Sequence, residues 1–82
     1  MATYKHIGFI IDDSTNSPIN FEVHSVDTIG PGYRIWGEVG VEPDVVTIPS
    51  VQFQGELNID GRQRLAERLA ADALRKHRAA KK

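Results

Sequence analysis

The stretch "FEVHSVDTIGPGYRIWGEVGV" (21–41) contains two alternating runs of residues separated by a turn sequence. In the second run, most alternate residues from Tyr33 to Val41 are apolar, and those between them are polar or small. Alternation with a period of two is typical of a half-buried β-strand. The separating "GPG" (30–32) suits a turn, because proline has the φ of the second turn position and glycine accepts a positive φ. This stretch therefore predicts a β-hairpin.

The same alternation occurs before the hairpin and, less clearly, after it. In "YKHIGFIID" (4–12), Ile7, Phe9 and Ile11 fall on one side. We therefore predict strands over about 4–12, 19–29 and 33–41. A fourth strand is predicted over 50–54, where Pro49 would start it late or place it at an edge. The alternative is that 45–59 is a loop that covers Trp36.

The end of the chain predicts a helix over about 61–79. This segment contains much alanine, no proline and no β-branched residue. Asp60 precedes it as a candidate N-cap. On a helical wheel, leucines and alanines occupy one half. The predicted fold is a single α+β domain over 1–82, an antiparallel meander of three or four strands with the C-terminal helix packed on one face.

Length and composition suggest a small cytoplasmic protein. The 82 residues leave room for one core. The chain has no cysteine, which favours a reducing compartment and excludes disulfides. No apolar run is long enough to span a membrane, and the start, "MATYKHIGF", lacks the pattern of a secretory signal. We therefore expect a bacterial-type cytoplasmic protein, complete as given, without a cofactor.

Charge is distributed unevenly along the chain. Residues 1–60 carry two basic and nine acidic residues, a net charge of −7, and residues 61–82 carry eight basic and two acidic residues, a net charge of +6. Five basic side chains share the polar half of the helix: Arg64, Arg68, Arg75, Arg78 and Lys82. This stripe could follow a phosphate backbone or bind an acidic protein. It could also be a solvated face, balanced by local acids and the helix dipole.

The turn positions predict a register for the strands. A loop at 12–18 pairs Phe9 with Phe21 and Ile7 with Val23, and a loop at 30–32 pairs Val23 with Val39. This register leaves two rows on the uncovered face of the sheet. They are Tyr4–Val26–Trp36 and His6–His24–Glu38.

These two rows are the candidate sites on the sheet. The row His6, His24 and Glu38 could bind a divalent metal, form a pH-responsive pair or be an ordinary polar face. The row Tyr4, Val26 and Trp36 could be a protein interface, could stack nucleic-acid bases, or could be buried by 45–59.

The order of elements resembles that of several short bacterial proteins of unknown function, in which three or four antiparallel strands precede an alanine-rich helix. The segments that carry this resemblance are "YKHIGFII", "FEVHSV", "YRIWGEV" and "LAERLAADAL". The resemblance implies the fold and no activity.

Catalytic motifs are absent from the sequence, which contains no cysteine, no G-x-S-x-G and no H-E-x-x-H. We therefore expect a non-enzymatic protein-interaction module, or a homodimer, that uses the sheet face around Tyr4, Val26 and Trp36. The alternative is a nucleic-acid-binding accessory protein that uses the basic helix face.

Overall fold

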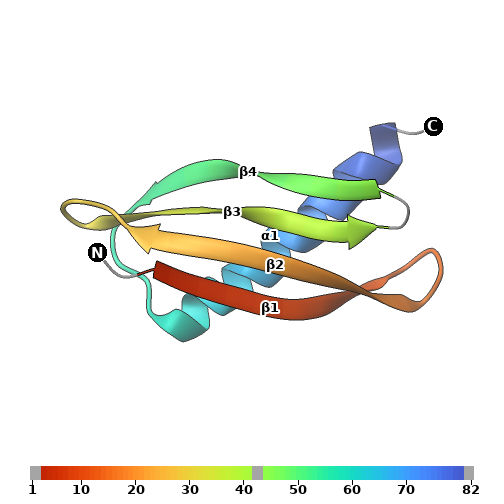
Figure 1. Ribbon diagram of the computed structural model, residues 1–82, viewed down its shortest axis with the longest axis horizontal. Helices are drawn as coiled ribbons and strands as arrows, with labels where there is room; N and C mark the ends of the chain where they lie inside the picture. Colours follow the sequence, from red (N-terminus) through yellow and green to blue (C-terminus); the bar gives the residue numbers. More distant parts are fainter. Residues whose placement is uncertain (1–2, 42–43, 81–82) are drawn as a thin grey trace.

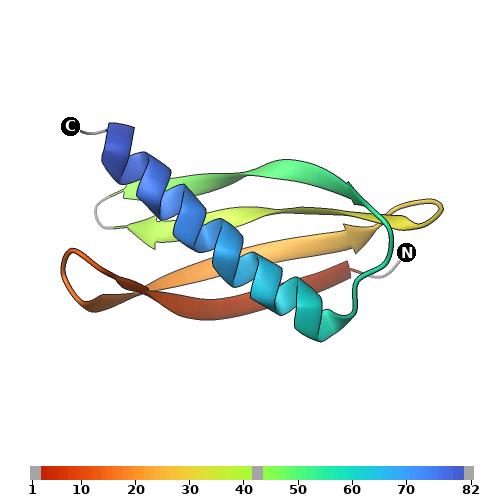
Figure 2. The same ribbon diagram turned by 180° about the vertical axis from the view of Figure 1, so that it is seen from behind.

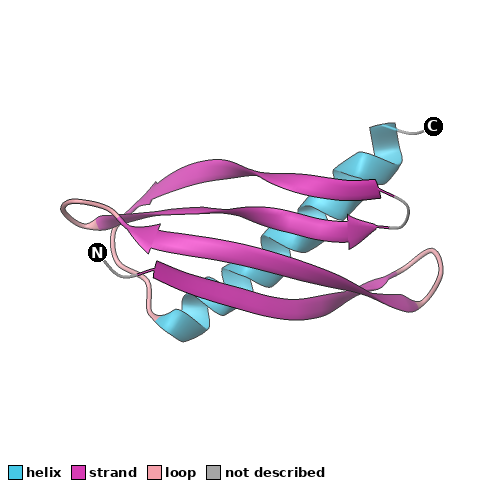
Figure 3. Ribbon diagram, viewed as in Figure 1, coloured by secondary structure: helices cyan, strands magenta, loops and turns pink. Residues whose placement is uncertain are grey.

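The computed structural model describes residues 3–41 and 44–80. Four strands are followed by one helix (Figures 1 and 3). The elements are β1 (Thr3–Asp12), β2 (Ser17–Asp27), β3 (Gly32–Val41), β4 (Asp44–Gln54) and α1 (Ile59–Ala80). The strands form one antiparallel sheet in the order β1-β2-β3-β4. The predicted α+β meander with a C-terminal helix is confirmed.

The helix covers one face of the sheet and leaves the other uncovered. It crosses the strands diagonally, from the N-terminal end of β1 toward β4 (Figure 2). We call the covered side the helix face and the opposite side the outer face. β4 lies within the sheet beside β3, so the alternative in which 45–59 forms a loop over Trp36 is wrong.

The helix begins two residues before the predicted start. The side chain of Asn58 accepts a hydrogen bond from the Gly61 backbone N–H at 2.7 Å, which makes Asn58 the N-cap. Asp60 instead lies in the first turn, where its charge complements the helix dipole.

The core lies between α1 and the helix face. Its buried side chains come from every element except β1: Phe21, Val23, Ile35, Val39, Ile48, Ala66 and Ala70. Because the two helix residues are alanines, the helix backbone can approach the strands closely. This core contains the sheet residues that alternation predicted for β2 and β3.

The predicted register between β1 and β2 is wrong by one residue. Phe21 pairs with Gly8 instead of Phe9, and Val23 pairs with His6 instead of Ile7. The turn is shorter than predicted, since Asp12 already pairs with Ser17. A one-residue shift reverses the two faces of a strand. The apolar side of β1 therefore faces outward.

The Asp12 side chain stabilises this shorter turn. One carboxylate oxygen of Asp12 accepts hydrogen bonds from the backbone N–H and the hydroxyl of Ser14, at 3.0 and 2.9 Å. The other accepts a hydrogen bond from the Thr15 hydroxyl at 3.2 Å. Asn16 adopts a φ of 56°, which asparagine tolerates better than most residues.

The predicted register between β2 and β3 is wrong by two residues, which leaves the faces unchanged. Val39 pairs with Phe21, and Val23 pairs with Gly37. The connecting loop is longer than the predicted 30–32, and the Thr28 N–H donates to the Gly32 carbonyl at 3.1 Å. The β3–β4 pairing is irregular between Ile35 and Gly37, where β4 contains Pro49.

Candidate protein-interaction surface

The outer face carries a row of exposed apolar side chains along β1. Ile7, Phe9 and Ile11 are 67%, 61% and 50% exposed. They occupy alternate positions of one strand and therefore point to the same side. Single exposed apolar residues are common on protein surfaces, whereas a contiguous group of large ones marks a contact site. We call Ile7, Phe9 and Ile11 the β1 apolar row.

A shallow hollow continues this surface toward β4. It has a volume of about 300 Å³ and lies beside Ile7, with Gly40 and the exposed Val45 on its far side. Gly40 pairs with Val45 and has no side chain to fill the space. Asn20, Glu22 and Glu38 also line the hollow, so polar side chains separate the β1 apolar row from Val45.

Charged residues occupy the middle of the outer face. Glu22 and Glu38 are directly paired across β2 and β3. Glu22 also lies 3.3 Å from the Lys5 ammonium and 3.4 Å from His24 Nε2. Two carboxylates at opposed positions repel each other, and contact with Lys5 reduces that repulsion. This part of the face is polar and accessible to solvent.

Trp36 lies at the other end of the outer face, half-buried and stacked on His24 with ring centroids 5.6 Å apart. It lines an open hollow of about 390 Å³ together with Val26, Arg34 and residues of β4. The predicted row Tyr4–Val26–Trp36 is not formed, because its register is wrong. Val26 pairs with Arg34 and Thr3, and Trp36 pairs with His24.

Tyr4 lies on the helix face, where its ring contacts Arg62 of α1. His6 lies on the same face and is only 7% exposed. It is therefore separated by the sheet from the outer-face residues His24 and Glu38, and the predicted row His6–His24–Glu38 is not formed. Within residues 3–41 and 44–80, no group of three histidine or acidic side chains is arranged to hold a metal ion.

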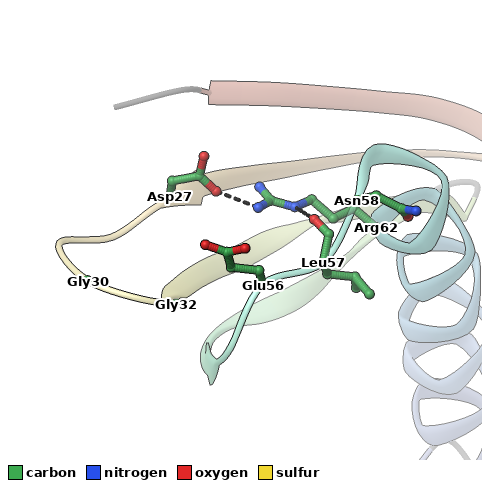
Figure 4. Close-up of a pocket in the computed structure, with 7 residues that line it drawn as sticks. All are labelled: Asp27, Gly30, Gly32, Glu56, Leu57, Asn58 and Arg62. Carbon is green, nitrogen blue, oxygen red and sulfur yellow. Dashed lines mark hydrogen bonds and ion pairs between the residues drawn. The ribbon is translucent and has the colours of Figure 1, made fainter.

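Arg62 is the centre of a polar cluster that the sequence patterns did not indicate. The residue is only 6% exposed. Its Nε donates a hydrogen bond to the Leu57 carbonyl at 2.9 Å, and its Nη2 forms an ion pair with Asp27 (Figure 4). Its guanidinium lies between the rings of Tyr4 and Tyr33, at 4.9 and 4.8 Å from their centroids. Such cation–π contacts stabilise a desolvated guanidinium.

The Arg62 cluster borders a polar cavity of about 420 Å³ at the start of the helix. The residues that line it with Arg62 are Asp27, Gly30, Gly32, Glu56, Leu57 and Asn58 (Figure 4). Sequence spacing could have located Arg62, because it precedes the buried Ala66 and Ala70 by four and eight residues and so lies on the same helix stripe. The helical-wheel prediction named only the leucines and alanines of that half and did not include Arg62.

His6 is the titratable group most affected by this cluster. Burial, together with the positive charge of Arg62, lowers the pKa of His6 below 6.5. Its Nε2 is buried and has no hydrogen-bond partner among the described protein atoms. Both effects favour the neutral imidazole.

The basic stripe of the helix is only partly available to a partner. Arg64 and Arg68 are exposed, but Arg75 pairs with Asp72 at 3.1 Å and Arg78 pairs with Asp12. Lys82 lies outside the described residues.

The Arg78 pair also affects Asp12. Burial alone would raise the pKa of Asp12, but hydrogen bonds from Ser14 and Thr15 and the charge of Arg78 together lower it. Arg78 therefore joins the end of the helix to the end of β1.

No helix within 3–41 and 44–80 is long and apolar enough to cross a membrane. No family model, curated protein or solved structure matches this chain.

Proposed function

We propose that this chain is a small, non-enzymatic protein-interaction module that binds through the β1 side of its outer sheet face. The observation that carries the proposal is the β1 apolar row, in which three large side chains are at least half exposed. Covering each of them would contribute on the order of 1–2 kcal/mol to binding. The hollow beside Gly40 adjoins this row, and its lining combines the apolar Ile7 and Val45 with the polar Asn20 and Glu22.

This contact surface differs from the one expected from the sequence, which was centred on Tyr4, Val26 and Trp36. Tyr4 is excluded, because it packs against Arg62 on the helix face. Val26 and Trp36 remain on the outer face, at its opposite end from Phe9. We place them at the periphery of the contact surface.

The test compares the proteins captured from cell extract by three baits: the unmodified chain, Phe9→Lys and Ile29→Lys. Phe9→Lys places a charge in the row, so specific partners should be lost. Ile29 is 97% exposed but stands alone in the β2–β3 loop, so Ile29→Lys is the matched control and should retain them. Circular dichroism checks that each bait is folded. Equal capture by all three baits would rule out the β1 apolar row as the contact surface.

Nucleic-acid binding by the basic helix face is the second candidate. It is favoured by Arg64 and Arg68, which are exposed one helical turn apart. It is weakened because Arg75 and Arg78 already pair with acids of the same chain. A gel-shift assay at low salt tests it, with Arg64→Gln/Arg68→Gln as the variant expected to lose binding.

We also propose that the chain belongs to the group of short bacterial proteins that it resembles, and that it is cytoplasmic. The order of four strands and a helix supports the first, and the absence of cysteine is compatible with the second.

A further inference from the structure

The two edges of the sheet differ in how well they are protected against a further strand. β1 and β4 are the edge strands. β4 contains Pro49 at an irregularity in its ladder with β3, and both proline and bulges discourage pairing at an edge. β1 has ten residues, no proline and an unbroken ladder with β2. The open edge is therefore β1.

The β1 apolar row lies along this open edge, away from the centre of the outer face. If two copies stacked their outer faces, Glu22 and Glu38 of both would enter the interface. Four desolvated carboxylates would oppose such stacking strongly. A second copy that pairs along the β1 edge leaves these carboxylates in water.

The sequence of β1 is self-complementary in one antiparallel register. With Phe9 opposite Phe9 of the second copy, Ile7 faces Ile11 in both directions on the outer face. Beyond the paired strands, Lys5 faces Asp13, an exposed residue in the turn after β1. A shift of two residues either way places Lys5 opposite Ile11, or Asp13 opposite Ile7. The match of apolar residues and opposite charges therefore selects one register.

We propose that two copies of this chain join through β1 in this register and form a continuous eight-stranded antiparallel sheet. The proposal rests on the proposed function and names its partner as a second copy. A two-fold axis at Phe9 perpendicular to the sheet keeps both helices on the same face. The ladder uses residues 6–12 of each copy and leaves out 3–5, beside which the first turns of α1 project past the edge of the sheet (Figure 2).

Cysteine cross-linking tests the register, because the natural chain has no cysteine. In Phe9→Cys, the two opposed Cα atoms would lie about 4.5–5.5 Å apart, within the range of a disulfide. Mild oxidation should convert most of this variant into a covalent dimer. Ile7→Cys alone should form no covalent dimer under oxidation, because its two cysteines would be roughly 13 Å apart. A mixture of Ile7→Cys and Ile11→Cys should give the cross-linked heterodimer.

A charge exchange provides a second test that needs no cross-link. Asp13→Lys places two lysines opposite each other at both ends of the ladder and should weaken dimerisation on the order of tenfold. Lys5→Glu/Asp13→Lys restores opposite charges across the ladder and should recover part of the affinity, since it also removes the contact of Lys5 with Glu22. Sedimentation over a concentration series measures both variants against the natural chain.

The outcomes separate this proposal from the proposed function. Efficient cross-linking of Ile7→Cys alone would overturn the register. A natural chain that stays monomeric at millimolar concentration would overturn the dimer. If capture of another protein still depends on Phe9 in that case, the interaction module stands without the dimer. If that dependence is also absent, both proposals fail.

Discussion

Arg62 connects the start of the helix to three strands. Its guanidinium contacts Tyr4 of β1, Asp27 of β2 and Tyr33 of β3, and its Nε binds the Leu57 carbonyl just before the helix. A charged side chain on the buried stripe of a helix requires such partners, because an unpaired buried charge is costly. This residue therefore fixes the angle at which the helix begins.

We predict that Arg62→Met lowers the free energy of unfolding by about 2–4 kcal/mol. Methionine retains much of the volume between the two rings, but it leaves Asp27 and the Leu57 carbonyl without their donor. Urea unfolding at neutral pH measures the loss. The control is Arg64→Met on the exposed face, which should change stability by less than about 0.5 kcal/mol. Equal effects of the two substitutions would show that the Arg62 contacts contribute little.

His6 makes the stability of the folded protein depend on pH in the mildly acidic range. In the unfolded chain its imidazole has its ordinary pKa of 6.5, whereas in the folded protein the pKa is lower. As pH falls below about 6.5, the unfolded state takes up a proton that the folded state does not. Stability therefore decreases with falling pH until the folded-state pKa is passed.

We predict that His6→Gln reduces the loss of stability between about pH 7.5 and 5.5. Urea unfolding midpoints at the two pH values measure the effect. His24→Gln, at a half-buried position on the outer face, is the matched control for removal of a histidine and should leave most of the loss in place. If the loss of stability is unchanged in His6→Gln but reduced in His24→Gln, the pH dependence comes from His24 and the prediction is wrong.

At the scale of elements, the alternation of apolar and polar residues predicted the presence of the strands well. It was a poorer guide to which side of each strand is buried. The faces of β2 and β3 were predicted correctly, because an error of two residues in register preserves them. The β1 face was predicted incorrectly, because period two is the same whichever side is buried. The face of β1 was wrong because the prediction placed the apolar residues Ile7, Phe9 and Ile11 in the core. The correct β1 face carries Gly8, which leaves room for the Phe21 ring, and His6.

The turn after β1 explains why the sequence alone does not determine the β1–β2 register. Its letters, "DDSTNSP", allow several turn lengths. The shorter turn is selected by hydrogen bonds from Ser14 and Thr15 to Asp12 and by the pairing of Arg78 with Asp12 across the molecule. The last of these depends on the packed helix, which a local pattern does not contain.

Gly37 has a specific role in the pairing of β2 with β3. A Cβ atom at this position would lie 2.2 Å from the Glu22 carbonyl oxygen and 2.8 Å from the Val23 Cα. Both are backbone atoms of the central pair of strands, so they cannot move aside independently. At Gly40, a Cβ atom would lie 3.7 Å from the Asn20 carbonyl oxygen, which is an ordinary contact.

We predict that Gly37→Ala destabilises the protein by at least about 2 kcal/mol, because the strands must separate to admit the methyl group. Gly40→Ala, the matched substitution in the same strand, should change stability by less than about 1 kcal/mol. Thermal and urea unfolding of the two variants make the comparison. If Gly40→Ala were the more damaging of the two, the β2–β3 register described above would be wrong.

At the scale of the whole molecule, the part of the chain that forms the sheet and the part that forms the helix carry opposite net charge. The net charges of −7 for residues 1–60 and +6 for residues 61–82 correspond closely to sheet and helix. Among the residues that the structure describes, two ion pairs cross between the layers, Arg62 with Asp27 and Arg78 with Asp12. Two of the eight basic residues of 61–82 therefore hold the helix to the sheet.

This arrangement predicts that added salt destabilises the fold. The screening length falls from ~10 Å at 0.1 M to ~3 Å at 1 M salt, so attraction between the layers weakens as NaCl is added. The urea midpoint should fall between about 0.1 and 0.5 M NaCl. Arg78→Gln lacks one interlayer pair and should show a smaller fall, whereas Arg68→Gln, which removes an exposed charge outside both pairs, should resemble the natural chain. An unchanged or rising midpoint in the natural chain would show that the opposite charges of the two halves do not stabilise the fold, and the helix stripe would then be more available to an acidic partner.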